Sequence, residues 1–350
     1  MTISEVAARA GVSVSTVSKA LSGRGSLRAE TRARVAEVAA ALGYRSNALA
    51  VNLLQGRSFT VGLLTNDSFG RFALPVLLAA EDTLELGQMA VLLCDGRDDE
   101  ARVRHYLDTL LSRRVDGIIV TGRRGDPRPP IGQNLPVPVV YAMSESTGAR
   151  DISVLPDDEG GGRLAIEHLL ASGRRHIAHV TGPRDFRAAR LRARGAVRAL
   201  EAAGLTLAGR RVRYGEWSEA FGRAALDELL DSVPALDAVF CGSDQIARGV
   251  ADALRDRDRS VPDDVALVGF DNWTVMAEAC RPALTTIDMN LAGIGRKAAE
   301  LLLAAIDGEL NPGAHLVPCE LVVRASSGPH PSAAPGNPGR ASQPRRAGAR

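Results

Sequence analysis

The chain has 350 residues, of which 45% are hydrophobic and 24% charged, so it can bury more than one core and is neither disordered nor fibrous. Its formal net charge is only +2, but residues 1–60 carry 8 Arg or Lys against 3 Glu, which suits a phosphate-rich partner. The 4 cysteines lack disulfide-framework or zinc-ligand spacing, and no apolar run reaches the roughly 20 residues that cross a bilayer, so we expect a cytoplasmic protein without metal or membrane contact.

Three short helices are predicted within residues 1–45. The spacing of Thr2 and Glu5 predicts a capping box at the start of the first helix, which Gly11 ends in a left-handed conformation. Ser13 predicts the cap of a second helix, and a repeat of apolar residues predicts a third over about 29–42. Each helix is too short to be stable alone, so we expect the three to share one small core.

The first two of these helices have the features of a helix-turn-helix that reads DNA. The run ISEVAARAGVSVSTVSKAL places the small Ala7 where the helices cross, Gly11 at the turn, and Val12 and Val17 toward the core. The second helix is then left with an outward face that can enter a major groove, made of Val14, Ser15, Thr16, Ser18 and Lys19.

Residues 46–57 are predicted to form a linker. Within it, the segment SNALAVNLLQ predicts a brief amphipathic helix that ends at Gly56. After the linker, the short helical pattern gives way to apolar strands.

Residues 58–328 alternate apolar strands with helix-length segments, which is typical of doubly wound parallel sheets buried on both faces. A break in the pattern near 144–157 predicts two sheets rather than one. The predicted strands are 60–66, 89–95, 115–120, 137–143, 176–182, 236–244 and 265–272. Residues 329–350 have almost no large apolar side chain but 4 Arg, and we expect a disordered basic tail.

The head resembles the lactose/galactose repressor family, whose members open with an AxxAGVSxxTVSxxL pattern. The resemblance implies that Val14, Ser15 and Lys19 face base edges. It also implies phosphate contacts from Ser13, Thr16, Ser18 and Ser22. For the serines an alternative remains, in which Ser13 only caps a helix and Ser18 only faces water.

In the linker, the family's NxxAxxL segment falls on Asn47, Ala50 and Leu53. In that family the segment folds as a hinge helix on the operator and its leucine wedges into the minor groove. The resemblance therefore implies that Leu53 is the wedge and that the other two residues lie against the groove. A leucine that packs a partner helix is the alternative.

The body resembles the two-lobed sugar-binding proteins of the periplasm, on stretches such as RRVDGIIV, SVPDDVALVGFDN and LTTIDMN. The expected fold is thus a small all-α helix-turn-helix head joined to an α/β, periplasmic-binding-protein-like body of two doubly wound parallel-sheet lobes. Ligands of open α/β sheets lie beyond the carboxyl ends of strands. That rule and the resemblance together give the expected effector-binding residues: Asn66, Phe72, Arg190, Trp217, Ser243 and Asp271.

These features predict a ligand-responsive repressor that binds a palindromic DNA operator as a homodimer and senses a sugar or similar polar metabolite. The resemblance places the dimer interface around 72–86 and 98–113. Whether the effector induces or co-represses stays open, and a purine is not excluded. A transport binding protein would lack the DNA head. An enzyme is disfavoured because no phosphate-loop, dinucleotide or nucleophile-elbow motif occurs, and we expect no cofactor and no catalytic residue.

Overall fold

The computed structural model describes residues 2–21, 26–44, 57–67 and 70–328. Four of the expected DNA-binding residues and the predicted tail lie outside the described residues, as does nearly all of the linker. These are Ser22, Asn47, Ala50, Leu53 and residues 329–350.

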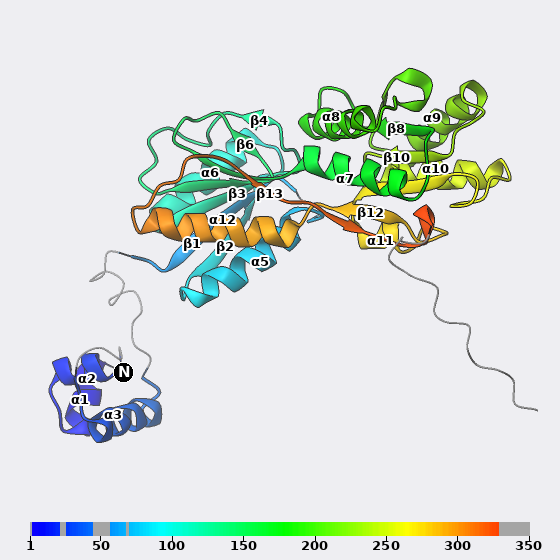
Figure 1. Cartoon of the computed structure of the whole chain (residues 1–350). Helices are drawn as coiled ribbons and strands as arrows, with labels where there is room; N and C mark the ends of the chain where they lie inside the picture. Colours follow the sequence, from blue (N-terminus) through cyan, green and yellow to red (C-terminus); the bar gives the residue numbers. More distant parts are fainter. Residues whose placement is uncertain (1, 22–25, 45–56, 68–69, 329–350) are drawn as a thin grey trace, which may run out of the picture.

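The head consists of α1 (Ile3–Ala10), α2 (Val14–Leu21) and α3 (Ala29–Ala41), drawn in blue in Figure 1. The predicted capping box is confirmed: the Glu5 amide donates to Thr2 Oγ1, and the Thr2 amide donates to Glu5 Oε2 at 2.7 Å. Gly11 ends α1 with φ of 65°. Val6, Val17 and Val35, one from each helix, are fully buried in the shared core that the sequence predicted.

The N-terminal lobe is built on a parallel sheet whose strand order is β13-β7-β5-β3-β1-β2. Helices cover both of its faces, and β1, β3 and β7 are almost completely buried, which accounts for their mostly apolar sequences. Its elements are β1 (Thr60–Thr65), α5 (Ala73–Leu86), β2 (Ala90–Asp95), α6 (Glu100–Ser112), β3 (Gly117–Thr121), β5 (Val139–Ala142), β7 (Ile152–Pro156), α12 (Leu291–Ile306) and β13 (Gly313–Val317). A separate ladder pairs β4 (Pro127–Arg128) with β6 (Glu145–Ser146).

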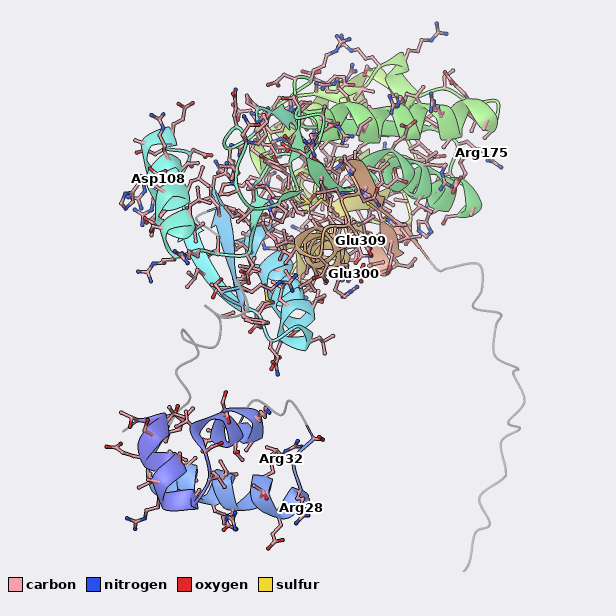
Figure 2. All side chains as sticks on the ribbon, turned by 90° about the vertical axis from the view of Figure 1, so that its left-hand side faces the viewer. Arg28, Arg32, Asp108, Arg175, Glu300 and Glu309 are labelled. Atoms are coloured by element: carbon pink, nitrogen blue, oxygen red, sulfur yellow. The ribbon has the colours of Figure 1, made fainter. Side chains whose placement is uncertain are left out.

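The C-terminal lobe has the strand order β14-β12-β11-β10-β8-β9, parallel except for β14. Its elements are α7 (Asp158–Ala171), β8 (Ile177–Thr181), α8 (Arg187–Ala202), β9 (Arg213–Tyr214), α9 (Glu219–Ser232), β10 (Ala238–Cys241), α10 (Asp244–Asp256), β11 (Ala266–Asp271), α11 (Thr274–Ala277), β12 (Thr285–Asp288) and β14 (Glu320–Val322). Asp108 on α6 and Arg175 ahead of β8 extend from the surfaces of the two different lobes (Figure 2).

Within residues 70–328 the chain passes between the lobes three times, after β7, after β12 and after β13. The carboxyl ends of both sheets therefore meet at the junction of the lobes. None of the helices in the described segments is long and apolar enough to cross a membrane.

All seven predicted strands are present, but the sequence pattern missed others. The predicted break at 144–157 contains a further strand, β7, and the passage to the second lobe follows it. Strands β12, β13 and β14 were also not predicted. The strand β13 carries partly exposed residues at the edge of its sheet, so it lacks a continuous apolar run.

Candidate functional site

The outward face of α2 in the head is polar except for one valine. Ser15, Ser18 and Lys19 are exposed, whereas Val17 and Ala20 are buried against α1 and α3. Val14 is a large apolar side chain that remains 44% exposed. The face therefore offers hydroxyl and ammonium donors beside an apolar group, the combination that reads base edges and thymine methyl groups in a major groove.

Ser13 has a structural role as well as a predicted phosphate contact. Its Oγ accepts from the Thr16 amide at 3.1 Å, which caps α2 as predicted. The same Oγ lies 2.8 Å from the hydroxyls of Ser15 and Thr16. The three hydroxyls thus gather at the N-terminus of α2, where the helix dipole favours an anion.

A cavity of about 360 Å³ lies at the junction of the lobes. It combines aromatic rings, four guanidinium groups and three carboxyl groups, as sites for polar organic ligands do. Its lining residues are Arg71, Phe72, Arg123, Arg124, Gly125, Asp126, Met143 and Pro156 from the N-terminal lobe, and Asp158, Phe186, Ala188, Arg192, Trp217, Ser243, Gln245, Asp271 and Met289 from the C-terminal lobe.

Glycines bring together α7 and α8, the helices that contribute Asp158 and Arg192 to this cavity. A Cβ on Gly162 would lie 2.2 Å from the backbone oxygen of Arg192, and one on Gly195 would lie 2.0 Å from the oxygen of Glu159. The two helices can therefore approach only because these positions lack side chains. This approach sets Arg192 of α8 against Asp158 at the start of α7.

Arg192 is the central cation of the cavity. Its Nε donates to Asp158 Oδ1 at 2.8 Å, and its Nη1 donates to the Gly242 carbonyl at 2.6 Å and to Asp271 Oδ1 at 3.2 Å. The guanidinium stacks over the ring of Phe270 with 3.6 Å between Cζ and the ring centre. Burial opposes the charge of Arg192, but the two carboxylates outweigh burial and raise its pKa, so it stays charged.

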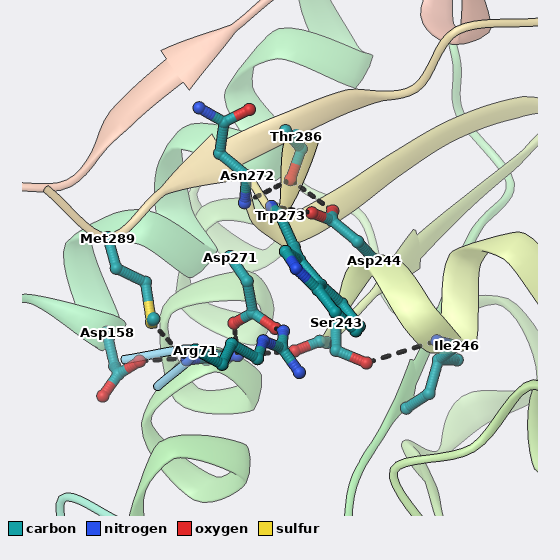
Figure 3. Close-up of polar contacts among 12 residues, drawn as sticks. Arg71, Asp158, Ser243, Asp244, Ile246, Asp271, Asn272, Trp273, Thr286 and Met289 are labelled. Carbon is teal, nitrogen blue, oxygen red and sulfur yellow. Dashed lines mark hydrogen bonds and ion pairs between the residues drawn. The ribbon is translucent and has the colours of Figure 1, made fainter. Parts of the chain in front are cut away.

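Two carboxyl groups lie close together at the cavity, Asp271 in its lining and the buried Asp244 behind it. Asp244 accepts from the Trp273 amide at 2.7 Å and from the Thr286 hydroxyl, while Asp271 faces the cavity (Figure 3). Burial, followed by the negative charge of Asp271, raises the pKa of Asp244 to about 7. Asp271 itself has φ of 106°, a strained conformation for a residue with a side chain.

Trp217 is an aromatic wall of the cavity. A Cβ on Gly182 would lie 2.0 Å from Cε2 of Trp217, so the indole packs directly on the backbone after β8. Phe186 meets the indole edge to face at 5.8 Å between ring centres. Rings held this firmly can contact the apolar face of a ligand at low entropic cost.

The structure brings four of the six expected effector-binding residues together at the cavity: Phe72, Trp217, Ser243 and Asp271. The Ser243 hydroxyl also caps α10 by accepting from the Ile246 amide. Asn66 is not among the lining residues and donates to Asp98 at the edge of the N-terminal lobe.

Arg190, expected in the cavity, lies outside it. It is exposed and donates to the carbonyl groups of Arg184 and Asp185. The helical period explains the difference: α8 buries Ala189, Ala196 and Leu200, and position 192 lies on that face whereas position 190 does not. This spacing was readable in the run AARLRARGAVRAL. The cavity arginines 71, 123 and 124 had no comparable signal, because they lie in loops.

Among the residues that the structure describes, no group of three or more His, Cys, Asp or Glu is arranged to hold a metal ion. Fold and cavity together define a two-lobed binding protein of the periplasmic type that carries a helix-turn-helix head.

Comparison with known proteins supports both the helix-turn-helix head and the two-lobed body. Residues 2–47 match the family model "Bacterial regulatory proteins, lacI family", and residues 166–327 match the "Periplasmic binding protein-like domain". The chain is 35% identical over 340 residues to the HTH-type transcriptional regulator CelR of Thermobifida fusca, covering 93% of this chain and 98% of that protein. It is 31% identical over 307 residues to the ribose operon repressor of Escherichia coli, covering 87% and 93% of the two chains.

Solved structures give the same result. A CelR–cellobiose complex matches with a TM-score of 0.62 and 33% identity over 93% of this chain and 99% of the other. The lac repressor dimer bound to operator and the anti-inducer ONPF matches with a TM-score of 0.74 and 26% identity over 94% and 99%. The chain belongs to the lacI family of bacterial regulatory proteins.

Proposed function

We propose that the protein is a ligand-responsive, sequence-specific transcriptional repressor that acts in the cytoplasm. The observation that carries the proposal is the presence, in one chain, of an exposed polar helix face on a small DNA-binding head and of a ligand-sized cavity between two lobes. Effector binding shifts the population between arrangements of the lobes and so changes operator affinity.

The bases are read by Val14, Ser15 and Lys19, and the phosphates by Ser13, Thr16, Ser18 and Ser22. Residues Asn47, Ala50 and Leu53 act in the minor groove. The boundaries of the four parts are those expected from the sequence: 1–45, 46–57, 58–328 and 329–350.

The effector is a sugar or a similar polar metabolite. Phe72 and Trp217 offer ring faces, and Asp271 with Arg192 offers charged hydrogen-bond partners for hydroxyl groups. Arg192 therefore takes the role first expected of Arg190. Because CelR binds cellobiose in its solved complex, cellobiose is the first ligand to test. Both Asp158 and Asp271 accept from Arg192, which suits ligand positioning rather than proton transfer in an enzyme.

The repressor acts as a homodimer. One head reads only a half-site, and two-fold symmetry matches a palindrome. In the N-terminal lobe, Leu74 and Leu78 of α5 are 52% and 55% exposed, and Leu93 of the edge strand β2 is 55% exposed. Exposed leucines grouped on neighbouring elements support a subunit contact there.

Selection of bound sequences from a random DNA pool by the full-length protein tests this function. Enrichment of one palindrome, and its release or capture by a metabolite from a panel that includes cellobiose, supports the proposal. A pool that remains random after selection contradicts it.

A further inference from the structure

One arginine in the cavity joins the two lobes directly. Arg71 belongs to the N-terminal lobe, immediately ahead of α5, and it forms an ion pair with Asp271 at the end of β11 in the C-terminal lobe (Figure 3). The two side chains are 21% and 7% exposed. Their charges therefore interact in a partly dehydrated site, where an ion pair is screened less than at the surface.

Aromatic rings hold the same guanidinium. Cζ of Arg71 lies 4.3 Å from the ring centre of Trp273, in the C-terminal lobe, and 4.8 Å from that of Phe72. A planar guanidinium can stack on rings and form an ion pair at the same time, which an ammonium does less well. Arg71 thus contacts the opposite lobe both through Asp271 and through Trp273.

A second set of contacts joins the lobes elsewhere at the cavity. Arg124 stacks over Phe186 with 3.6 Å between Cζ and the ring centre. Arg187 Nε forms an ion pair with Glu145 Oε2 at 3.0 Å, and the Arg187 amide donates to Asp126 Oδ1 at 2.8 Å. The cavity is lined by residues of both sets, which include Arg71, Asp271, Arg124 and Phe186.

We propose that Arg71 is an internal latch that holds the lobes together over the effector cavity, and that the effector competes with Arg71 for Asp271. This inference rests on the proposed function in one respect, that the cavity is the effector site. A hydroxyl-rich ligand that bonds to Asp271 Oδ2 competes with the Arg71 guanidinium, which donates to that oxygen, while Oδ1 accepts from Arg192.

The latch also gives a route from the cavity to the rest of the N-terminal lobe. Arg71 lies two residues before the first residue of α5, Ala73, whose amide donates to Asp67. Release of Arg71 therefore acts on the start of the helix that exposes Leu74 and Leu78, the proposed dimer contact. A ligand bound to Asp271 would in this way alter the subunit contact made by α5.

Hydrogen exchange of the Arg187 amide measures the latch without any ligand. As the first residue of α8, Arg187 has no intrahelical acceptor, and its amide bonds to Asp126 across the lobes. Exchange at this amide in the ligand-free, full-length protein should be about tenfold faster in Arg71→Gln, the change expected from losing one charged contact. Arg123→Gln is the matched control, because the Arg123 ion pair to Asp98 stays within the N-terminal lobe.

Unchanged exchange at Arg187 in Arg71→Gln, or the same acceleration in Arg123→Gln, overturns the latch. Arg71→Lys keeps the charge but loses the planar stacking, so it should exchange at an intermediate rate even if Arg71→Gln folds poorly. Binding of the wild-type chain to selected DNA is measured in parallel. If the wild-type chain selects no DNA sequence, the proposed function is wrong. If it binds selected DNA but hydrogen exchange at the Arg187 amide is unchanged in Arg71→Gln, only the latch is wrong.

Discussion

Arg192 and Asp158 form a buried ion pair across the contact of α7 and α8, with side chains only 5% and 3% exposed. Removal of one partner leaves the other charge buried and uncompensated, so Arg192→Met should lower the free energy of unfolding by about 3–5 kcal/mol. Denaturant titration measures the effect. The exposed Arg190→Met, two positions away, should change it by less than about 0.5 kcal/mol. Equal effects of the two substitutions would refute the assigned role of Arg192.

The contact between Gly182 and Trp217 gives a test of the cavity wall. Gly182→Ala adds a Cβ that would lie 2.0 Å from the indole, so Trp217 must move and ligand affinity should fall by at least about tenfold. Isothermal titration of the metabolite that changes operator affinity measures this loss. The control is Gly125→Ala, in the same cavity, where the nearest atom would lie at 3.6 Å. If Gly182→Ala binds as the wild type does, Trp217 is not a ligand contact.

A substitution on the exposed face of α2 should distinguish contacts to base edges from contacts to phosphates. Lys19→Ala removes a donor to base edges and should weaken binding to the selected palindrome by about 1–3 kcal/mol, with a smaller loss for a scrambled duplex. Fluorescence anisotropy at fixed salt compares the two duplexes. Arg34→Ala on α3, also exposed but outside the face, is the control. Equal losses on both duplexes in Lys19→Ala would remove Lys19 from the base-reading set.

Asp244 predicts a dependence of stability on pH. Because its pKa is raised to about 7 in the folded protein, the folded state binds more protons than the unfolded state between about pH 4 and pH 7. The contribution of Asp244 to stability is therefore greatest at low pH and is lost as the pH rises through about 7.

The neutral variant Asp244→Asn should lose less stability than the wild type between pH 5 and pH 8, as measured by the midpoint of thermal unfolding. His179 contributes with the opposite sign, since burial lowers its pKa to about 4 and its stabilising effect is lost as the pH falls from 6.5. Because His179 is present in both proteins, its contribution cancels in the difference between Asp244→Asn and the wild type. Parallel pH curves for the two proteins would contradict the assignment to Asp244.

The sequence predicted the head closely because its signals are local. The capping box at Thr2 and Glu5, the turn at Gly11 and the cap at Ser13 each depend on residues within three or four positions. Seven strands were equally readable as apolar runs, whereas β7 and β12, which are also buried within their sheets, were missed. The edge strand β13 was not readable either, because its pairing with β7 joins residues more than 150 positions apart in the chain.

The cavity was only partly predictable for the same reason. Asp271 ends β11 and Ser243 lies just beyond β10, so the strand-end rule together with the resemblance placed them at the site. Arg71 reaches Asp271 across 200 positions of sequence from a loop, and no periodic pattern marks it. Arg192 could have been predicted from helical spacing. Once Ala189 and Ala196 are placed on the buried face of the helix, position 192 lies on that face and position 190 does not.

In the proposed mechanism, occupancy of the cavity controls how tightly the head binds its operator. The most direct measurement is the affinity of the full-length protein for its selected palindrome and for a scrambled duplex, with and without a saturating metabolite that binds the cavity. We expect the metabolite to change affinity for the palindrome by at least about fivefold, the lower end of coupling between two sites, and to change affinity for the scrambled duplex far less. The same palindrome affinity with the cavity empty and full would contradict the account.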